Sequence, residues 1–203
     1  MSAKRMYVSP LREQAAARTR ALILLRAAEL FADCGYGRVT VADIASAAGV
    51  ASQTVFTSVG SKGDILDRIV EQGVVASGYE QAMQRVLALR TPESVLEALA
   101  HGTRLGNESQ FTVYEAIRKA LPVHENGAAL WERATAAYRD ALHATARHLH
   151  GLPPPPPYSV TETADLLWFW FGPTGWRTLV VESGWSWDRA QTVLYRAAVA
   201  GLY

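Results

Sequence analysis

One segment of the 203-residue chain, residues 39–66, constrains the fold more than any other. Thr40 precedes a run of apolar residues at helical spacing, and Asp43 follows three positions later, a pattern typical of a capped helix start. Gly49 then supplies a residue that tolerates positive φ, at which this short helix can end. A second short helix is predicted over residues 51–59. Two short helices joined by a glycine turn predict a helix-turn-helix arrangement.

The outer face of the second short helix is small, polar and uncharged. Val55 and Val59 face inward at helical spacing. The residues left on the outer face are Ser52, Gln53, Thr57 and Ser58. Gln pairs in a bidentate way with adenine, Ser and Thr hydroxyls tolerate several bases, and their apolar carbons can touch the thymine methyl. This face therefore suits base edges in a DNA groove.

Basic residues around this face are candidates for phosphate contacts. Because the face itself has no Lys or Arg, attraction to phosphate must come from its surroundings. The candidates are Arg18, Arg20, Arg38 and Lys62. Ser61 begins a second capping pattern, which places Lys62 in the first turn of the next helix. Its ammonium and the free backbone amides there both favour an anion.

These features occur together in an order that resembles a known family. A first helix over Thr19–Cys34, then Gly35-Tyr36, Thr40, Ile44-Ala45-x-x-Ala48-Gly49-Val50, Thr54-Val55-Phe56 and Ser61-Lys62-x-x-Leu66 resemble the amino-terminal domain of TetR-family transcriptional regulators. The resemblance covers Arg20–Leu66 and implies that residues 51–59 form the recognition helix. It also implies phosphate contacts by Thr40, Thr54, Phe56 and Lys62, and base contacts by Ser52, Gln53, Thr57 and Ser58.

Three residues depart from the family pattern. Ala51 stands where the family usually has Ser, and loss of that N-cap costs about 1 kcal/mol unless Ser52 takes over the role. Phe56 replaces the usual Tyr and lacks its phenolic donor to phosphate. Val59 replaces the usual Phe as a smaller core residue. These changes predict a weaker or differently registered grip on DNA.

Charge and composition agree with a nucleic-acid face at one end of the chain. Residues 1–62 contain eight Lys and Arg against four Asp and Glu, so they carry +4, while the whole chain carries +1. Residues 1–16 show no apolar period, and we expect a basic flexible arm that can enter a minor groove. The lone Cys34 cannot form an internal disulfide, which favours a reducing, cytoplasmic location. Polar breaks in the apolar stretch 164–181 argue against a membrane span.

Helical patterns continue to the end of the chain and predict an all-α fold. Helices are expected at residues 62–79, 93–105, 109–121, 127–149, 161–182 with a bend near 172–175, and 187–202. We expect three parts. They are an arm over residues 1–16, a three-helix helix-turn-helix DNA-binding domain over residues 17–61, and a helical bundle over residues 62–203 for effector binding and dimerisation.

A partner chain and an effector are expected in the second part. The apolar run over residues 166–171 circles its whole helix, so one face can pack internally while another meets a second copy. The TetR resemblance implies the same homodimer through the last two helices, a palindromic DNA operator, a small-molecule effector, and repression relieved by that effector. Aromatic residues with polar tips on central helices are the candidate pocket walls. They are His101, Phe111, Tyr114, Trp131, Tyr138 and Trp168.

Other classes of function are less well supported. His143, His148 and His150 are spaced by five and two residues, which does not align metal ligands on one helical face. No nucleophile elbow or phosphate-cradling Gly loop is present, so we expect no metal, no cofactor and no catalytic residues. One alternative is a helical small-molecule binding protein whose DNA affinity has degenerated. A hydrolase-like enzyme in a helical fold is the more distant alternative.

Overall fold

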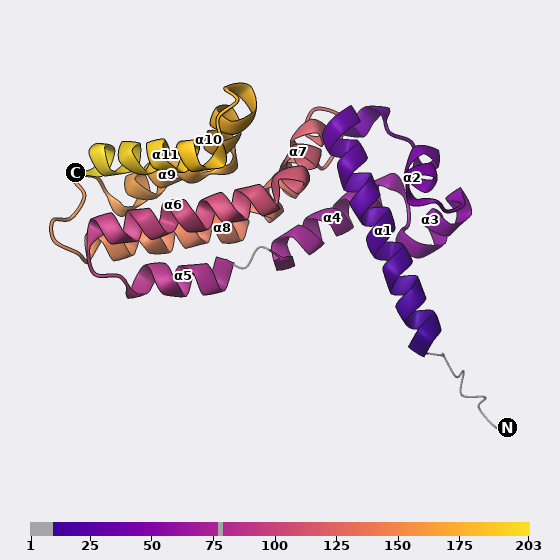
Figure 1. Cartoon of the computed structure of the whole chain (residues 1–203), viewed down its shortest axis with the longest axis horizontal. Helices are drawn as coiled ribbons and strands as arrows, with labels where there is room; N and C mark the ends of the chain where they lie inside the picture. Colours follow the sequence, from indigo (N-terminus) through magenta and orange to yellow (C-terminus); the bar gives the residue numbers. More distant parts are fainter. Residues whose placement is uncertain (1–9, 77–78) are drawn as a thin grey trace. The chain divides into compact units, whose positions relative to one another are not determined.

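The computed structural model describes residues 10–76 and 79–203, and every regular element among them is helical (Figure 1). The all-α prediction is therefore confirmed for the described residues. The elements in chain order are α1 (Pro10–Cys34), η1 (Tyr36–Arg38), α2 (Val41–Ala48), α3 (Ser52–Val59), α4 (Lys62–Ala76), α5 (Tyr79–Ala88), α6 (Pro92–Ser109), α7 (Phe111–Ala120), α8 (Gly127–His150), α9 (Val160–Phe171), α10 (Pro173–Arg177), the π-helical turn η2 (Thr178–Glu182) and α11 (Trp187–Leu202).

The described chain forms two compact units. The first contains the residues up to Gln72 together with Glu115–Trp131, and the second contains Gly73–Tyr114 and Glu132–Tyr203. This division differs from the boundary expected between residues 61 and 62. The apolar face of α4 is the physical reason, because Ile65 and Leu66 are fully buried and Ile69 and Val70 nearly so within the first unit.

The first unit is built around α1. This helix packs against both α2 and α3, which also pack against each other. The shared core contains Ile23 and Phe31 from α1, Ile44 from α2 and Val55 from α3, all with no exposed surface. The apolar spacing that predicted these helices thus also defines the surface that holds them together.

The start of α1 corrects one prediction. Residues 10–16 were expected in a flexible arm, but they form the first turns of α1. Pro10 suits a first helical position, Glu13 lies in the first turn, and Ala15–Ala17 have the highest helix propensity. Residues 10–16 lack a periodic apolar pattern because they form an exposed part of a helix, not because they form a flexible arm. Residues 1–9, the rest of the expected arm, lie outside the described residues.

Helix α4 covers Lys62–Ala76 of the helix expected over residues 62–79. Residues 77 and 78 lie outside the described residues. Helix α5, Tyr79–Ala88, was not predicted from the sequence beyond residue 79.

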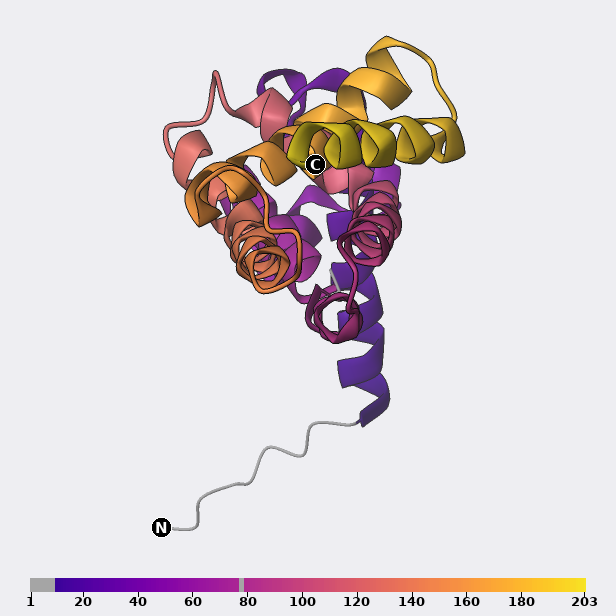
Figure 2. The same cartoon turned by 90° about the vertical axis from the view of Figure 1, so that its left-hand side faces the viewer.

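The second unit is a bundle of α5, α6, α9 and α11 with most of α8. α6 packs against α5 and α11, and α9 packs against α11. In Figure 2 α5, α6 and α8 are seen nearly end-on, with α9 and α11 lying to one side of them. Their shared core includes Leu96, Tyr138, Leu167 and Trp176. Thr91 caps α6 through a bond from the Ser94 amide, with Pro92 in the first turn.

The penultimate helix is divided where the sequence predicted a bend. α9 ends at Phe171 and α10 begins at Pro173, because proline cannot donate to the preceding turn. The break also needs small residues, since a Cβ on Gly172 would lie 2.4 Å from the Trp168 carbonyl oxygen. None of the helices in the described residues is long and apolar enough to cross a bilayer.

Candidate nucleic-acid interface and ligand cavity

The helix-turn-helix geometry begins with a reciprocal cap at Thr40. The Thr40 hydroxyl and amide donate to the Asp43 carboxylate at 2.7 and 2.8 Å, and the Asp43 amide donates back to the hydroxyl at 3.2 Å. The bonds that Thr40 donates hold the pKa of the Asp43 carboxyl below its usual value, and the bond from the hydroxyl has the larger effect. At the other end of α2, Gly49 has φ +66°, the left-handed conformation expected of a C-cap glycine. Both predicted ends of α2 are therefore confirmed.

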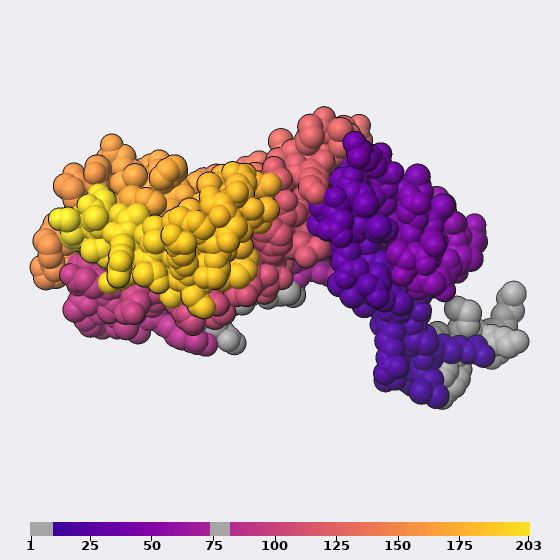
Figure 3. Space-filling model, turned by 45° about the horizontal axis from the view of Figure 1, so that its top comes forward, coloured from indigo at the N-terminus to yellow at the C-terminus, as the bar shows by residue number. Residues whose placement is uncertain are grey.

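The recognition helix expected at residues 51–59 is α3. Val55 and Val59 are buried, while Ser52, Gln53 and Thr57 are exposed. Thr54 and Ser58 are half-buried at the edges of that face. The space-filling view shows α2 and α3, in violet, at the surface of the first unit (Figure 3). The uncharged polar face predicted from the sequence is thus available to a ligand.

Hydrogen bonds within α3 limit what this face can offer. The Thr57 hydroxyl donates to the carbonyls of Gln53 and Thr54 at 2.9 and 3.2 Å. Its proton is therefore committed to the helix, which leaves oxygen lone pairs and a methyl group for a base edge. The Gln53 side chain is exposed, and its amide group has both a hydrogen-bond donor and an acceptor.

The residues that depart from the family pattern have clear structural effects. Ala51 is the N-cap of α3 in extended conformation, and no side chain caps the helix there. The helix does not shift so that Ser52 takes over. Phe56 is 51% exposed, so its ring adds an apolar group beside the polar face. Val59 is 1% exposed and fills the core despite its smaller size.

The cations predicted to hold phosphate are in different environments. Arg18 and Arg38 are exposed, and Arg20 is half-buried. Lys62 donates from Nζ to the carbonyls of Tyr36 and Val39, both at 3.0 Å, and lies 4.3 Å from the Tyr36 ring centroid. Two of its three ammonium protons are therefore used inside the unit, and one remains for a phosphate.

Thr40 is similarly occupied. Both of its donors are bonded to Asp43, so a phosphate would have to replace that carboxylate as the acceptor. Its predicted phosphate contact stays a prediction, as do the contacts of the other residues on this surface.

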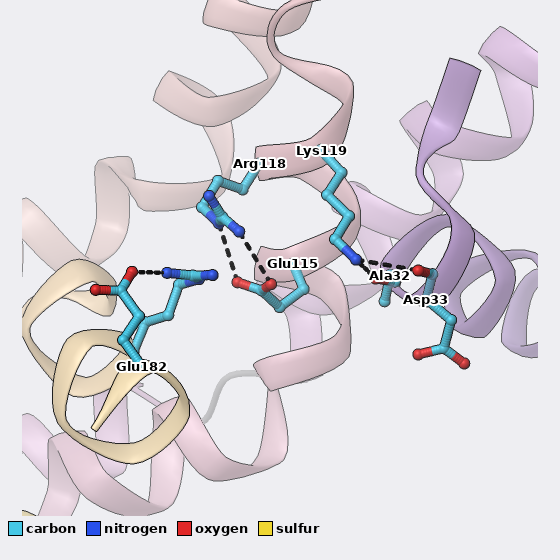
Figure 4. Close-up of polar contacts among 7 residues, drawn as sticks. Ala32, Asp33, Glu115, Arg118, Lys119 and Glu182 are labelled. Carbon is cyan, nitrogen blue, oxygen red and sulfur yellow. Dashed lines mark hydrogen bonds and ion pairs between the residues drawn. The ribbon is translucent and has the colours of Figure 1, made fainter. Parts of the chain in front are cut away.

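The structure adds residues of α7 and the following loop to the first unit. Lys119 donates from Nζ to the carbonyls of Ala32 and Asp33 in the last turn of α1 (Figure 4). Such carbonyls have no partner within their own helix, so a cation there stabilises the helix end. His124 packs edge-on against Tyr36, with ring centroids 5.1 Å apart. The sequence analysis missed both residues, because their partners are far away in the chain.

Figure 4 also shows a bidentate ion pair on α7. The guanidinium of Arg118 donates to both carboxylate oxygens of Glu115, at 3.1 and 3.2 Å. Glu115 is 7% exposed. The pairing accounts for this burial, because a buried carboxylate needs a charged partner or several donors.

A buried polar network lies at the centre of the second unit. The Tyr138 hydroxyl donates to the Phe171 carbonyl at the end of α9, and Trp176 donates from Nε1 to the same oxygen at 3.0 Å. Asn107 donates from Nδ2 to the Tyr138 hydroxyl at 3.1 Å. Burial raises the pKa of Tyr138, so its hydroxyl stays protonated. The polar residues Thr103 and Asn107, one helical turn apart, were the missed sequence signal for this network.

A small cavity lies beside this network, between α5, α6 and α8. Its volume is about 40 Å³, and its lining includes Met83, Leu99, Thr103, Tyr138 and Leu142. Tyr138 is therefore the one candidate pocket residue that lines it.

The other candidate pocket residues lie elsewhere. Trp168 packs edge-on against Tyr138 with ring centroids 5.6 Å apart, and Phe111 packs on Trp187 at 6.2 Å. Tyr114 is buried and His101 is exposed. Trp131 belongs to the first unit, so the structure does not gather the six into one site.

The histidines considered as metal ligands bond to other groups. Nε2 of His148 lies 2.8 Å from the Leu89 carbonyl oxygen, and Nε2 of His150 lies 3.2 Å from the Thr163 hydroxyl. Within the described residues, no three His, Cys, Asp or Glu side chains gather as a metal-binding group.

Comparison with known proteins agrees with the geometry of the first unit. Residues 23–69 match the sequence model of the bacterial regulatory proteins of the tetR family. No curated protein sequence matches the chain. The matched range covers α2 and α3 and the parts of α1 and α4 that pack around them.

Solved structures share the fold across nearly the whole chain. A putative fatty acid metabolism regulator from Clostridium perfringens is 17% identical, and the alignment covers 90% of this chain and 98% of that one with a TM-score of 0.68. A putative transcriptional regulator from Saccharomonospora viridis, in complex with choline, is 20% identical over 89% and 95% with a TM-score of 0.71. The regulator FadR from Bacillus subtilis, in complex with stearoyl-CoA, is 15% identical over 90% and 99%, also at 0.71.

A capped two-helix motif that presents an exposed polar helix face defines a helix-turn-helix DNA-binding module. Residues 23–69 of the first unit are such a module, similar to the tetR family of bacterial regulatory proteins. The chain is a DNA-binding transcriptional regulator with an all-helical second unit.

Proposed function

We propose that the chain is a repressor that binds a palindromic operator as a homodimer and leaves it when a small effector binds the second unit. The observation that carries this proposal is the exposed uncharged face of α3, and Arg38 of the same unit is exposed as well. In this proposal Gln53 reads a base edge, Arg18, Arg20 and Arg38 hold phosphates, and Lys62 uses its remaining proton for one more. The site of action is the cytoplasm, where bacterial DNA lies.

The dimer is proposed to form through the last two long helices. Apolar side chains remain exposed there, since Phe169 of α9 is 71% exposed, Val181 of η2 is 45% exposed and Val193 of α11 is 37% exposed. α11, in yellow, forms part of the molecular surface (Figure 3). A palindromic operator needs two α3 helices about 34 Å apart, so any ligand that changes this spacing releases DNA.

Ligand release is supported by the cavity in the second unit and by helices that belong to both units. α4, α7 and α8 each contribute residues to the first and the second unit. The structural relatives in complex with choline and with stearoyl-CoA support a small-molecule role for the second unit. We assign no catalytic residue to the chain.

The test is DNA binding by fluorescence anisotropy, with the DNA upstream of the chain's own gene compared with random DNA. Gln53→Ala is expected to lose about 1–3 kcal/mol of discrimination between the two, because a bidentate base contact disappears. Arg38→Ala is expected to weaken both complexes alike and to reduce the salt dependence by about one phosphate contact.

Gln72→Ala is the matched control, because it removes the same exposed amide from α4. It should bind like the unmodified chain. If Gln53→Ala and Arg38→Ala both bind normally, the interface is wrong. If the unmodified chain binds the upstream DNA no more tightly than random DNA, the repressor assignment fails. The alternative of a ligand-binding protein without useful DNA affinity then replaces it.

A further inference from the structure

The residues that line the cavity between α5, α6 and α8 indicate the charge of the ligand that it can bind. None of its described lining residues is Asp, Glu, Lys, Arg or His, and its walls are mainly aliphatic. A carboxylate or an ammonium group placed there would lose its water without gaining a charged partner. The lining therefore selects against charged ligands.

The hydroxyls of the lining residues Thr103 and Tyr138 indicate which hydrogen-bonding group a ligand needs. The Tyr138 hydroxyl donates its proton to the Phe171 carbonyl. The Thr103 hydroxyl donates to the Ala100 carbonyl at 3.2 Å, or alternatively to the Tyr138 oxygen beside it. In either orientation its proton has an acceptor inside the protein. Towards a ligand, Oγ1 of the lining residue Thr103 can therefore act only as an acceptor, and the group that matches it is a ligand O–H or N–H.

The size of the cavity adds a third constraint. About 40 Å³ exceeds the space that one water needs, but it is well below the roughly 150 Å³ of an apolar cavity that holds benzene. Met83 of α5 is the lining residue best able to yield, because its unbranched thioether adapts its shape. Its Sδ atom lies 3.5 Å from the Thr145 hydroxyl, which also has the Ala141 carbonyl oxygen as an acceptor at 3.0 Å. A ligand larger than a water therefore requires this side chain to rotate away from the cavity.

We propose that this cavity binds a compact uncharged molecule with one hydrogen-bond donor, of the size of a phenol, which Thr103 orients and Met83 admits. This inference rests on the proposed function only in taking such a molecule to be the effector. It excludes carboxylates, phosphates and quaternary ammonium ions as ligands of the cavity.

The test is isothermal titration calorimetry of the full chain with three probes of similar size and no DNA present. Phenol is expected to bind saturably, one per chain. Toluene, which lacks the donor, is expected to bind about five- to tenfold more weakly, as the loss of one hydrogen bond predicts. Benzoate is expected to give no binding. The proposal is overturned if the unmodified chain binds either benzoate or toluene as tightly as it binds phenol.

Variants then locate the site. Thr103→Val keeps the side-chain shape and removes the acceptor, so the preference for phenol over toluene should disappear, whereas Thr103→Ser should keep it. Met83→Ala should allow the larger 1-naphthol to bind more tightly. Glu97→Ala, at an exposed position of α6, is the control and should leave all the affinities unchanged. An unchanged preference in folded Thr103→Val would reject Thr103 as the anchor.

The result is separable from the proposed function. If the calorimetric series holds but no operator is bound, the cavity assignment stands and the repressor assignment fails. If an operator is bound but phenol is not, only the ligand class is rejected.

Discussion

Several polar side chains of this protein act at the ends of helices, where backbone carbonyls have no partner within the helix. Lys62 bonds to two carbonyls around η1, and Lys119 bonds to two in the last turn of α1. Tyr138 does the same at the end of α9 with a neutral hydroxyl. These partners are far apart in sequence, so each bond also ties one element to another. The same residues therefore contribute to the stability of the units that carry the candidate sites.

The structure predicts a stability role for Lys62 that is independent of DNA. Lys62→Met keeps the apolar stem but removes both carbonyl bonds and the cation above Tyr36. We expect the free energy of unfolding to fall by about 1–3 kcal/mol, since charge-assisted bonds are lost from a half-buried group. Urea unfolding without DNA measures this change. A fully stable variant with weakened DNA binding would instead assign Lys62 to phosphate alone.

Three capping carboxylates predict how stability depends on pH. Bonds from the side chains and then the amides of Thr40, Ser61 and Ser159 lower the pKa values of Asp43, Asp64 and Glu162. Because these folded-state values lie below those of the unfolded chain, the stabilisation is complete above the unfolded pKa of about 4 and is lost as the pH falls through the folded pKa. The unfolding midpoint should therefore fall as the pH is lowered from 5 to 3.

Asp43→Asn tests this for one cap. Its midpoint should lie below that of the unmodified chain at pH 7 and should approach it at pH 3, where the native carboxylate is protonated too. Asp140→Asn, at an exposed position of α8, controls for the loss of one negative charge. A constant difference across this pH range would argue against the cap as the source.

At the scale of the helices, local sequence signals predicted capped helix ends well, but they predicted poorly how far each helix extends. Thr40 and Gly49 correctly marked the two ends of α2, because caps act within one turn. The start of α1 at Pro10 was missed, since an exposed helix needs no apolar stripe. The helix α5 beyond residue 79 was also missed. The helix at α3 was predicted despite Ala51, a residue that supplies no cap.

The uncapped start of α3 predicts a stabilising substitution. Ala51 already has the extended conformation of an N-cap residue, φ −74° and ψ 148°. Ala51→Ser supplies a hydroxyl for an amide in the first turn and should raise the free energy of unfolding by about 1 kcal/mol. Thermal unfolding measures the gain, and Ala47→Ser on the exposed part of α2 is the control. No gain at Ala51 would show that water already satisfies those amides.

At the scale of the whole molecule, the division into two units follows packing and not sequence order. Residues 115–131 join the first unit although they follow more than forty residues of the second, from Gly73 onward. Val123 in this segment approaches Gly37, where an added Cβ would lie 3.7 Å from a Val123 methyl. A sequence boundary at residue 61 therefore separates residues that share one core.

The proposed homodimer gives a prediction at this scale. Phe169→Glu places a charge at the most exposed aromatic position of α9 and should convert a dimer into a monomer in sedimentation velocity, because a buried unpaired carboxylate opposes association. Leu11→Glu, at a 76% exposed position of α1, should leave the dimer intact. An unmodified chain that sediments as a monomer at micromolar concentration would reject the dimer itself.

The sequence by itself determined the all-helical class, the capped helices and the uncharged outer face of α3, because helical periodicity and caps depend on residues within a few turns of each other. Tertiary structure decided the rest. The carbonyls that occupy Lys62, the joining of residues 115–131 to the first unit, and the cavity whose lining includes Thr103 and Tyr138 all depend on contacts between distant segments. Such contacts leave no local pattern, since each residue type has many compatible partners and only the packed chain selects one.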